Sequence, residues 1–159
     1  MSRMVKYPTS AHEQANIFTT LNPSAYREVE GMPIQRLYME KTSIELPGTT
    51  KYGPYSAGVE AGGMVWLSGQ IAVEEGDDVK SQTQGSLDKI DALLDAAGIS
   101  KHNICFAQIL LADINDFTSI NEVYGAWVKD MQVKPARAAF AAAALPAGAL
   151  VEIVVQAMR

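Results

Sequence analysis

Apolar positions between residues 79 and 97 recur every three or four residues, which is the spacing of one buried face on an α-helix. Polar side chains fill the positions between them, so the pattern predicts an amphipathic helix from Val79 to Ala97. Gly98 follows directly and suits a helix C-cap. The predicted buried stripe consists of Val79, Thr83, Leu87, Ile90, Leu94 and Ala97.

A second helical pattern follows after residue 114. Asn115 or Asp116 can cap its first turn, and Pro135 prevents the helix from continuing further. The predicted buried stripe consists of Phe117, Ile120, Val123 or Tyr124, Trp127 and Met131.

Short apolar runs bounded by turn residues predict five strands. The run Met64 to Leu67 is apolar on both faces, as is typical of an interior strand. The element order β-β-α-β-α-β-β predicts an α+β domain with two helices on one face of a mixed sheet. The strands are predicted at Ser56–Ala61, Met64–Ser68, Ile104–Ala112, Ala136–Ala144 and Ala149–Ala157.

The chain divides near Pro47. Residues 1–46 contain three of the seven prolines and show no sustained periodicity, although Gln35 to Ile44 could form a strand. We therefore expect an N-terminal arm over residues 1–46 and one folded domain over residues 47–159.

Composition and charge narrow the class of protein. The 159 residues include 48% hydrophobic ones, enough for a globular core, and the formal net charge is −5. The 13 basic residues are scattered, which argues against a nucleic-acid partner. No secretory signal is visible, and no apolar run approaches the roughly 20 residues that a membrane helix needs. We expect a soluble cytoplasmic protein whose lone Cys105 is a buried, inert thiol.

Residues that bind metals or cofactors do not cluster in the sequence. His12 and His102 are far apart and have no partner at a ligand spacing, and no glycine-rich phosphate loop is present. We therefore expect no metal and no cofactor.

Arg137 and Glu152 stand out because each lies in an otherwise apolar strand. Burying a charge is costly unless it is paired or lies at the edge of a cleft. One interpretation is a buried ion pair between adjacent strands. The other is that the Arg137 fork binds a ligand carboxylate, while Glu152, with a pKa raised by burial, transfers protons.

Two short motifs carry further polar groups. The turn Tyr52-Gly53-Pro54-Tyr55-Ser56 fixes the direction of Tyr55, and Leu67-Ser68-Gly69-Gln70 ends a buried strand with small polar residues. Each motif alone is also compatible with a half-buried tyrosine or with simple strand termination.

Taken together, the motifs from about residue 45 to residue 159 resemble the reactive-intermediate deaminase (Rid, YjgF-like) family, and they occur in the family's order. The matching stretches are Gly53-Pro54-Tyr55-Ser56, Ser68-Gly69-Gln70-Ile71, Ala96-Ala97-Gly98, Asp113-Ile114-Asn115-Asp116-Phe117, Ile120-Asn121-Glu122-Val123-Tyr124, Pro135-Ala136-Arg137 and Leu145-Pro146-Ala147-Gly148-Ala149-Leu150-Val151-Glu152-Ile153.

The resemblance implies a chorismate-mutase-like α+β subunit, three of which pack around a barrel-like centre with active sites between subunits. It also implies that Arg137 holds the substrate carboxylate and that Glu152 positions the hydrolytic water. Tyr55, Ser68 and Asn121 match residues that line or shape the cleft.

The implied activity is hydrolysis of small enamines and imines of the 2-aminoacrylate type, giving a 2-keto acid and ammonia. Two alternatives remain: a dedicated catabolic deaminase of aminomuconate-type enamines, and a non-catalytic trimer that binds small carboxylates. Ala139 departs from the family, which often has Cys or Thr at that position, and the arm of about 45 residues is longer than in compact members. Both departures leave the substrate open.

Overall fold

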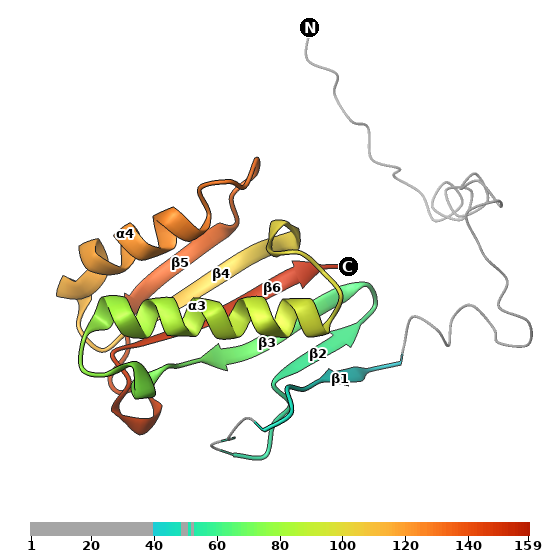
Figure 1. Cartoon of the computed structure of the whole chain (residues 1–159), viewed down its shortest axis with the longest axis horizontal. Helices are drawn as coiled ribbons and strands as arrows, with labels where there is room; N and C mark the ends of the chain where they lie inside the picture. Colours follow the sequence, from blue (N-terminus) through green and yellow to red (C-terminus); the bar gives the residue numbers. More distant parts are fainter. Residues whose placement is uncertain (1–39, 49–50, 52) are drawn as a thin grey trace, which may run out of the picture. The chain divides into compact units, whose positions relative to one another are not determined.

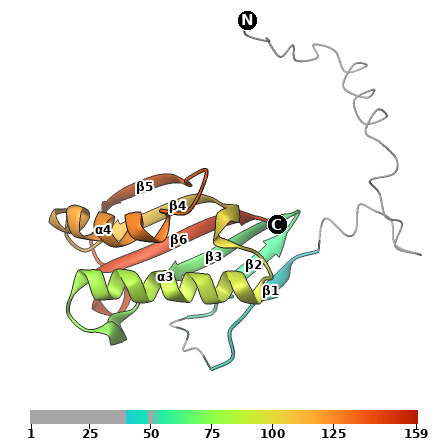
Figure 2. The ribbon, with the colours of Figure 1, turned by 45° about the horizontal axis from the view of Figure 1, so that its top comes forward.

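The computed structural model describes residues 40–48, 51 and 53–159. These residues form a six-stranded mixed sheet in the order β1-β2-β3-β6-β4-β5, with both α-helices on one face (Figure 1; Figure 2). Only β4 and β5 are parallel neighbours. The elements are β1 (Thr42–Ile44), β2 (Gly58–Ala61), β3 (Met64–Gln70), η2 (Val73–Glu75), α3 (Val79–Ala96), η3 (Lys101–Asn103), β4 (Ile104–Leu111), η4 (Ile114–Asp116), α4 (Phe117–Trp127), β5 (Ala136–Ala141), η5 (Pro146–Gly148) and β6 (Val151–Met158).

Helix α3 confirms the first predicted helix to within one residue. The Asp78 side chain caps its first turn by accepting a hydrogen bond from the Ser81 main-chain nitrogen at 2.8 Å. Gly98 follows the helix at φ +68°, in the left-handed region that glycine tolerates best. All six positions of the predicted stripe are buried against the sheet and α4.

Helix α4 is preceded by the short turn η4, which changes how its start is capped. The Asp113 side chain accepts from the Asn115 nitrogen at 2.9 Å, whereas Asp116 makes no side-chain cap bond. Asp116 thus occupies the predicted N-cap position, but the side-chain hydrogen bond expected of a cap is absent there. Phe117 is 38% exposed, so its place in the buried stripe was wrong, while the remainder of the stripe packs into the core.

The predicted mixed sheet with two helices on one face is confirmed, and each of the five predicted strands is present with shifted ends. A further strand, β1, lies within the segment Gln35 to Ile44 and pairs antiparallel with β2. Residues 1–39 of the predicted arm lie outside the described residues.

The two faces of the sheet differ in what covers them. On β6, Val151, Ile153 and Val155 are completely buried beneath the helices, whereas Glu152 and the alternate positions after it are only half-buried on the opposite, outer face. Trp66 of β3 points to that outer face and is 40% exposed. The interior strand predicted from its apolar pattern is thus covered on one face only in this chain.

The expectation of a buried Cys105 was wrong, because this thiol is exposed. Ile104 of β4 lies opposite Ala157 and Phe106 lies opposite Gln156, so two steps along β4 match one step along β6. Cys105 is the extra residue of this irregularity and lies outside the buried alternation.

Candidate functional site

Glu152 lines a hollow of about 440 Å³ on the outer face of the sheet, near the start of β6. Burial raises the pKa of the Glu152 carboxyl above its ordinary value. A carboxylate with a raised pKa is a better proton acceptor near neutral pH. The hollow is also lined by Gly53, Tyr55, Ser68, Gly69, Ile71 and Pro146.

Gly69 makes room for the Glu152 carboxylate. A Cβ atom built at position 69 would overlap the side chain of Glu152. The pairing of β3 with β6 shifts register between Leu67 and Gln70, so Gly69 lies in an irregular stretch at the end of the strand. The carboxylate therefore lies directly against main chain, which only glycine permits here.

Ser68 ties this hollow to the segment that follows Tyr55. Its main-chain nitrogen donates to the Ala57 carbonyl at 2.9 Å, and its hydroxyl donates to the Ser56 carbonyl at 2.8 Å. Both bonds fix the position of the neighbouring Tyr55. The structure thus brings together three of the residues predicted from the sequence, namely Tyr55, Ser68 and Glu152.

Gln82 of α3 supports the same hollow from the helix side. Its side-chain amide donates to the Gly76 carbonyl at 2.6 Å and accepts from the Leu150 nitrogen at 2.9 Å. Gln82 is only 3% exposed. Because Leu150 stands two residues before Glu152, this buried amide fixes the start of β6.

Arg137 lies on the opposite side of the sheet, where three residues of α4 hold it. Its guanidinium donates to the Asn121 side-chain oxygen at 2.7 Å. It also lies over the rings of Tyr124, at 4.9 Å from the centroid, and Phe117, at 5.6 Å. These three residues share one helix face. Arg137 itself remains exposed, so it can accept a ligand. We refer to Phe117, Asn121 and Tyr124 as the α4 shelf.

The buried ion pair between Arg137 and Glu152 is excluded within the chain. Strand β4 separates β5 from β6. Arg137 is opposite the fully buried Ala107 on the helix face, while Glu152 is opposite Leu110 and points to the outer face. The predicted site residues therefore form two separate groups, and Ala139 lies on the Arg137 side.

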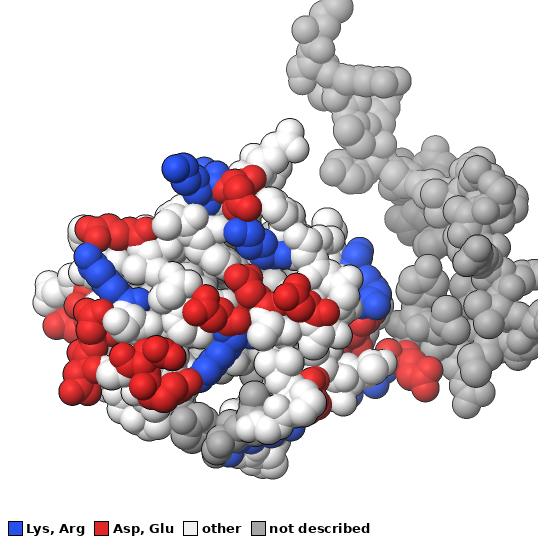
Figure 3. Space-filling view, in the orientation of Figure 1, with Lys and Arg blue, Asp and Glu red and all other residues white. Residues whose placement is uncertain are grey.

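Charge and metal-binding groups add no further centre to the part of the chain that is described. No group of three or more His, Cys, Asp or Glu side chains is arranged there to hold a metal ion. On the helix-bearing face, Lys and Arg side chains are interspersed with Asp and Glu rather than forming a basic stripe (Figure 3). Neither described helix has the length and apolar composition needed to cross a membrane.

A family model described as "Endoribonuclease L-PSP" matches residues 48–159. The 2-iminobutanoate/2-iminopropanoate deaminase of Escherichia coli K12 is 35% identical over 127 residues, which are 76% of this chain and 99% of that protein. "Protein mmf1, mitochondrial" of Schizosaccharomyces pombe is 32% identical over 142 residues, covering 83% of this chain and 86% of that one. The chain therefore belongs to the Rid (YjgF-like, L-PSP) family.

Solved structures have the same fold. The YjgF gene product of E. coli superposes with a TM-score of 0.68 at 34% identity, covering 74% of this chain and 98% of that one. E. coli TdcF with bound serine gives a TM-score of 0.67 at 38% identity, with the same coverage.

Four residues of these two groups were not identified from the sequence as parts of a site. Gly69 and Tyr124 lie inside recognised motifs, but the motifs do not show that one makes room for a carboxylate and the other supports a guanidinium. Phe117 was assigned to the core. Nothing in the sequence indicates that Gln82 supports a site. A glutamine on a helix is usually solvated, and its burial here depends on distant main-chain partners.

Proposed function

We propose that this protein hydrolyses small 2-imino acids, and the enamines that tautomerise to them, to 2-keto acids and ammonia. The observation that carries the proposal is Arg137: its guanidinium is exposed, and one acceptor and two rings hold it in place. A planar fork of this kind suits a substrate carboxylate. The deaminase name of the E. coli relative supports the same chemistry.

The complete site requires a second copy of the chain, because the Arg137 and Glu152 groups face opposite sides of one sheet. We propose a homotrimer in which Arg137 and Asn121 of one subunit meet Tyr55, Ser68 and Glu152 of the next. The uncovered outer face supports this assembly, since large apolar side chains are exposed on it, and such surfaces favour burial in an interface. They include Trp66 and Phe140.

The proposed reaction needs only positioning and proton transfer. Arg137 binds the carboxylate of the imine. Glu152 takes a proton from water as the water oxygen bonds to the imine carbon, and the imine nitrogen gains a proton. In the resulting carbinolamine the hydroxyl proton is lost and the nitrogen gains a proton, with Glu152 passing the proton between them, so that the carbon–nitrogen bond breaks and ammonia leaves. Water and the imine are thereby converted into ammonia and a 2-keto acid, and no redox step is involved.

A mixing experiment tests both the chemistry and the assembly. Arg137→Ala and Glu152→Gln each remove one half of the site, so each variant alone should be almost inactive. If the two are unfolded and refolded together, random trimers contain both intact halves at about one interface in four. We expect about a quarter of the wild-type rate of 2-iminopropanoate hydrolysis.

The matched control refolds each variant alone. Light scattering of the wild type should give the mass of three chains. If the mixture stays inactive while the wild type recovers its activity after the same treatment, the shared site is wrong. If the wild type binds 2-keto acids yet does not accelerate imine hydrolysis, the protein is a carboxylate-binding trimer instead.

A further inference from the structure

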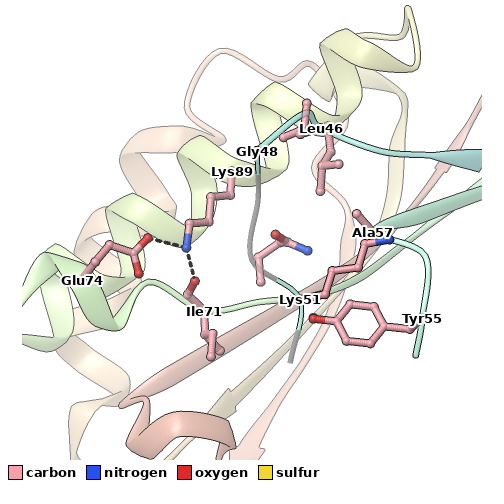
Figure 4. A pocket seen from close by; sticks show the side chains of 11 residues that line it. Leu46, Gly48, Lys51, Tyr55, Ala57, Ile71, Glu74 and Lys89 are labelled. Atoms are coloured by element: carbon pink, nitrogen blue, oxygen red, sulfur yellow. Dashed lines mark hydrogen bonds and ion pairs between the residues drawn. The ribbon is translucent and has the colours of Figure 1, made fainter. Parts of the chain in front are cut away.

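A second cavity of about 410 Å³ adjoins the Glu152 hollow. The two cavities share three lining residues, namely Tyr55, Gly69 and Ile71. In the close view, the Lys89 side chain extends from α3 on one side of the cavity, and Tyr55 and Lys51 lie on the other side (Figure 4). The two cavities therefore meet along Tyr55, Gly69 and Ile71, so a ligand beside Glu152 lies next to residues that bound the second cavity.

The charged groups around this cavity neutralise one another. The Lys89 ammonium donates to the Ile71 carbonyl at 2.6 Å and pairs with the Glu74 carboxylate at 2.5 Å. The Lys51 ammonium pairs with the Glu45 carboxylate at 2.8 Å. Two ammonium groups and two carboxylates leave no net charge to attract an ion.

The remaining lining is a mixture of apolar side chains and one amide. Leu46, Ala57, Ile71 and Leu93 line the cavity together with the Tyr55 ring. Gln70 also lines it, and its side-chain nitrogen donates to the Ser68 carbonyl at 2.8 Å. Leu93 and Ile71 are buried parts of the subunit core, so this wall is fixed by packing. An apolar group that enters gains by leaving water, and no unpaired charge opposes it.

We propose that this cavity receives the side chain of the substrate, and that the preferred substrates are 2-imino acids with an extended apolar side chain of three or more carbons. This inference rests on the proposed deaminase function, which by itself requires space for a methyl or ethyl group only. Branched aliphatic and thioether side chains fit the class.

The same features disfavour a substrate with a second carboxylate, such as an aminomuconate-type enamine. The second carboxylate of such a substrate would have to lose its water and enter the cavity, where both ammonium groups already have carboxylate partners. The desolvation cost of that charge would be uncompensated unless an existing ion pair broke. The cavity therefore selects by apolar burial rather than by charge.

The test compares substrates of different length in the full-length protein. An amino acid oxidase generates 2-iminopropanoate, 2-imino-4-methylpentanoate or the methionine-derived imine, and semicarbazide traps the imine that escapes hydrolysis. For the wild type we expect kcat/KM for the long imines to equal or exceed that for 2-iminopropanoate. Ala57→Phe, which fills the cavity, should lower the ratio of long-imine to short-imine kcat/KM about tenfold, the effect of roughly two buried methylene groups.

Ala92→Phe is the matched control, because Ala92 is exposed on α3 and the same ring added there should leave the ratio unchanged. Ala57→Leu provides a smaller filling if circular dichroism shows that the phenylalanine variant does not fold. An unchanged ratio in a folded filled variant overturns the inference, as does wild-type rejection of the long imines or a preference for the aminomuconate-type enamine.

Failure of the proposed function gives a different result, because then no imine of any length is hydrolysed faster than in buffer. The cavity can still be tested in that case by calorimetric binding of 4-methyl-2-oxopentanoate and pyruvate. Weaker binding of the longer keto acid by Ala57→Phe, with pyruvate binding retained, supports the cavity. Equal binding of the longer acid by both proteins overturns it.

Discussion

The Glu152 hollow and the α4 shelf hold their key residues by different physical means. Glu152 is positioned by main chain: it lies against Gly69, on a strand whose start Gln82 fixes. Arg137 is positioned by side chains alone and remains exposed at the edge strand β5. Burial thus raises the pKa of Glu152, while exposure leaves the Arg137 guanidinium open to an incoming anion.

The largest expected effect comes from removing the exposed group. Arg137→Ala should lower kcat/KM for imine hydrolysis by roughly 10²–10³-fold, because a charge-assisted fork to the substrate carboxylate is lost. The melting temperature should hardly change, since the side chain is exposed. Arg137→Lys keeps the charge without the fork and should recover only part of the activity.

Lys129→Ala removes another exposed cation and serves as the matched control. A large drop in melting temperature for Arg137→Ala, with activity preserved, would mean that the guanidinium is a structural group. Arg137 would then no longer differ from the buried Glu152 side as an exposed, ligand-binding group.

A smaller effect is expected when the buried half is disturbed through its main chain. Gly69→Ala places a methyl group where the Glu152 carboxylate lies, and that flexible side chain must move aside. We expect kcat/KM to fall roughly tenfold or more through misplacement of the proton acceptor, while thermal unfolding changes little. Enzyme kinetics and calorimetry measure the two quantities.

Gly125→Ala is the matched control, because nothing lies within 4 Å of the added atom on α4. Alanine is the better helix former, so this variant should gain about 0.5–1 kcal/mol of stability with unchanged activity. Equal activity of both glycine variants would show that Glu152 need not lie where it does.

The smallest effect concerns pH. Because burial raises the pKa of Glu152, its ionised form should be lost as the pH falls through a value above that of an ordinary glutamate, and kcat/KM should fall with it. The stability effect has the opposite sign: ionising a carboxyl whose folded pKa is raised disfavours folding. Glu152→Gln should therefore melt slightly higher at pH 7, and this difference should vanish below the ordinary pKa of glutamate. A melting difference that grows in acid would contradict this.

The elements of the fold were largely predictable, because periodicity reports local burial. The predicted stripe of α3 identified the buried face of that helix correctly. The exposure of Phe117 and Cys105 was not predictable, because it depends on other elements. Phe117 lies against the Arg137 guanidinium of β5, and Cys105 is the extra residue in the pairing of β4 with β6.

The arrangement of the site was less predictable than its members. Arg137 and Glu152 stood out as charges in apolar strands, and the resemblance to a known family gave them roles, but neither gave the strand order that places β4 between their strands. Pairing between distant segments is decided by packing of the whole sheet, which no local pattern contains. For the same reason the support that Gln82 gives to Leu150 was missed.

The position of β6 has a consequence for biosynthesis. It is the last strand in chain order, yet it lies between β3 and β4. While the chain emerges from the ribosome, these two strands each keep an unsatisfied hydrogen-bonding edge until residues 151–158 are available. The nascent polypeptide therefore cannot complete its sheet in stages, and the segment that carries Glu152 is also the one that closes the gap.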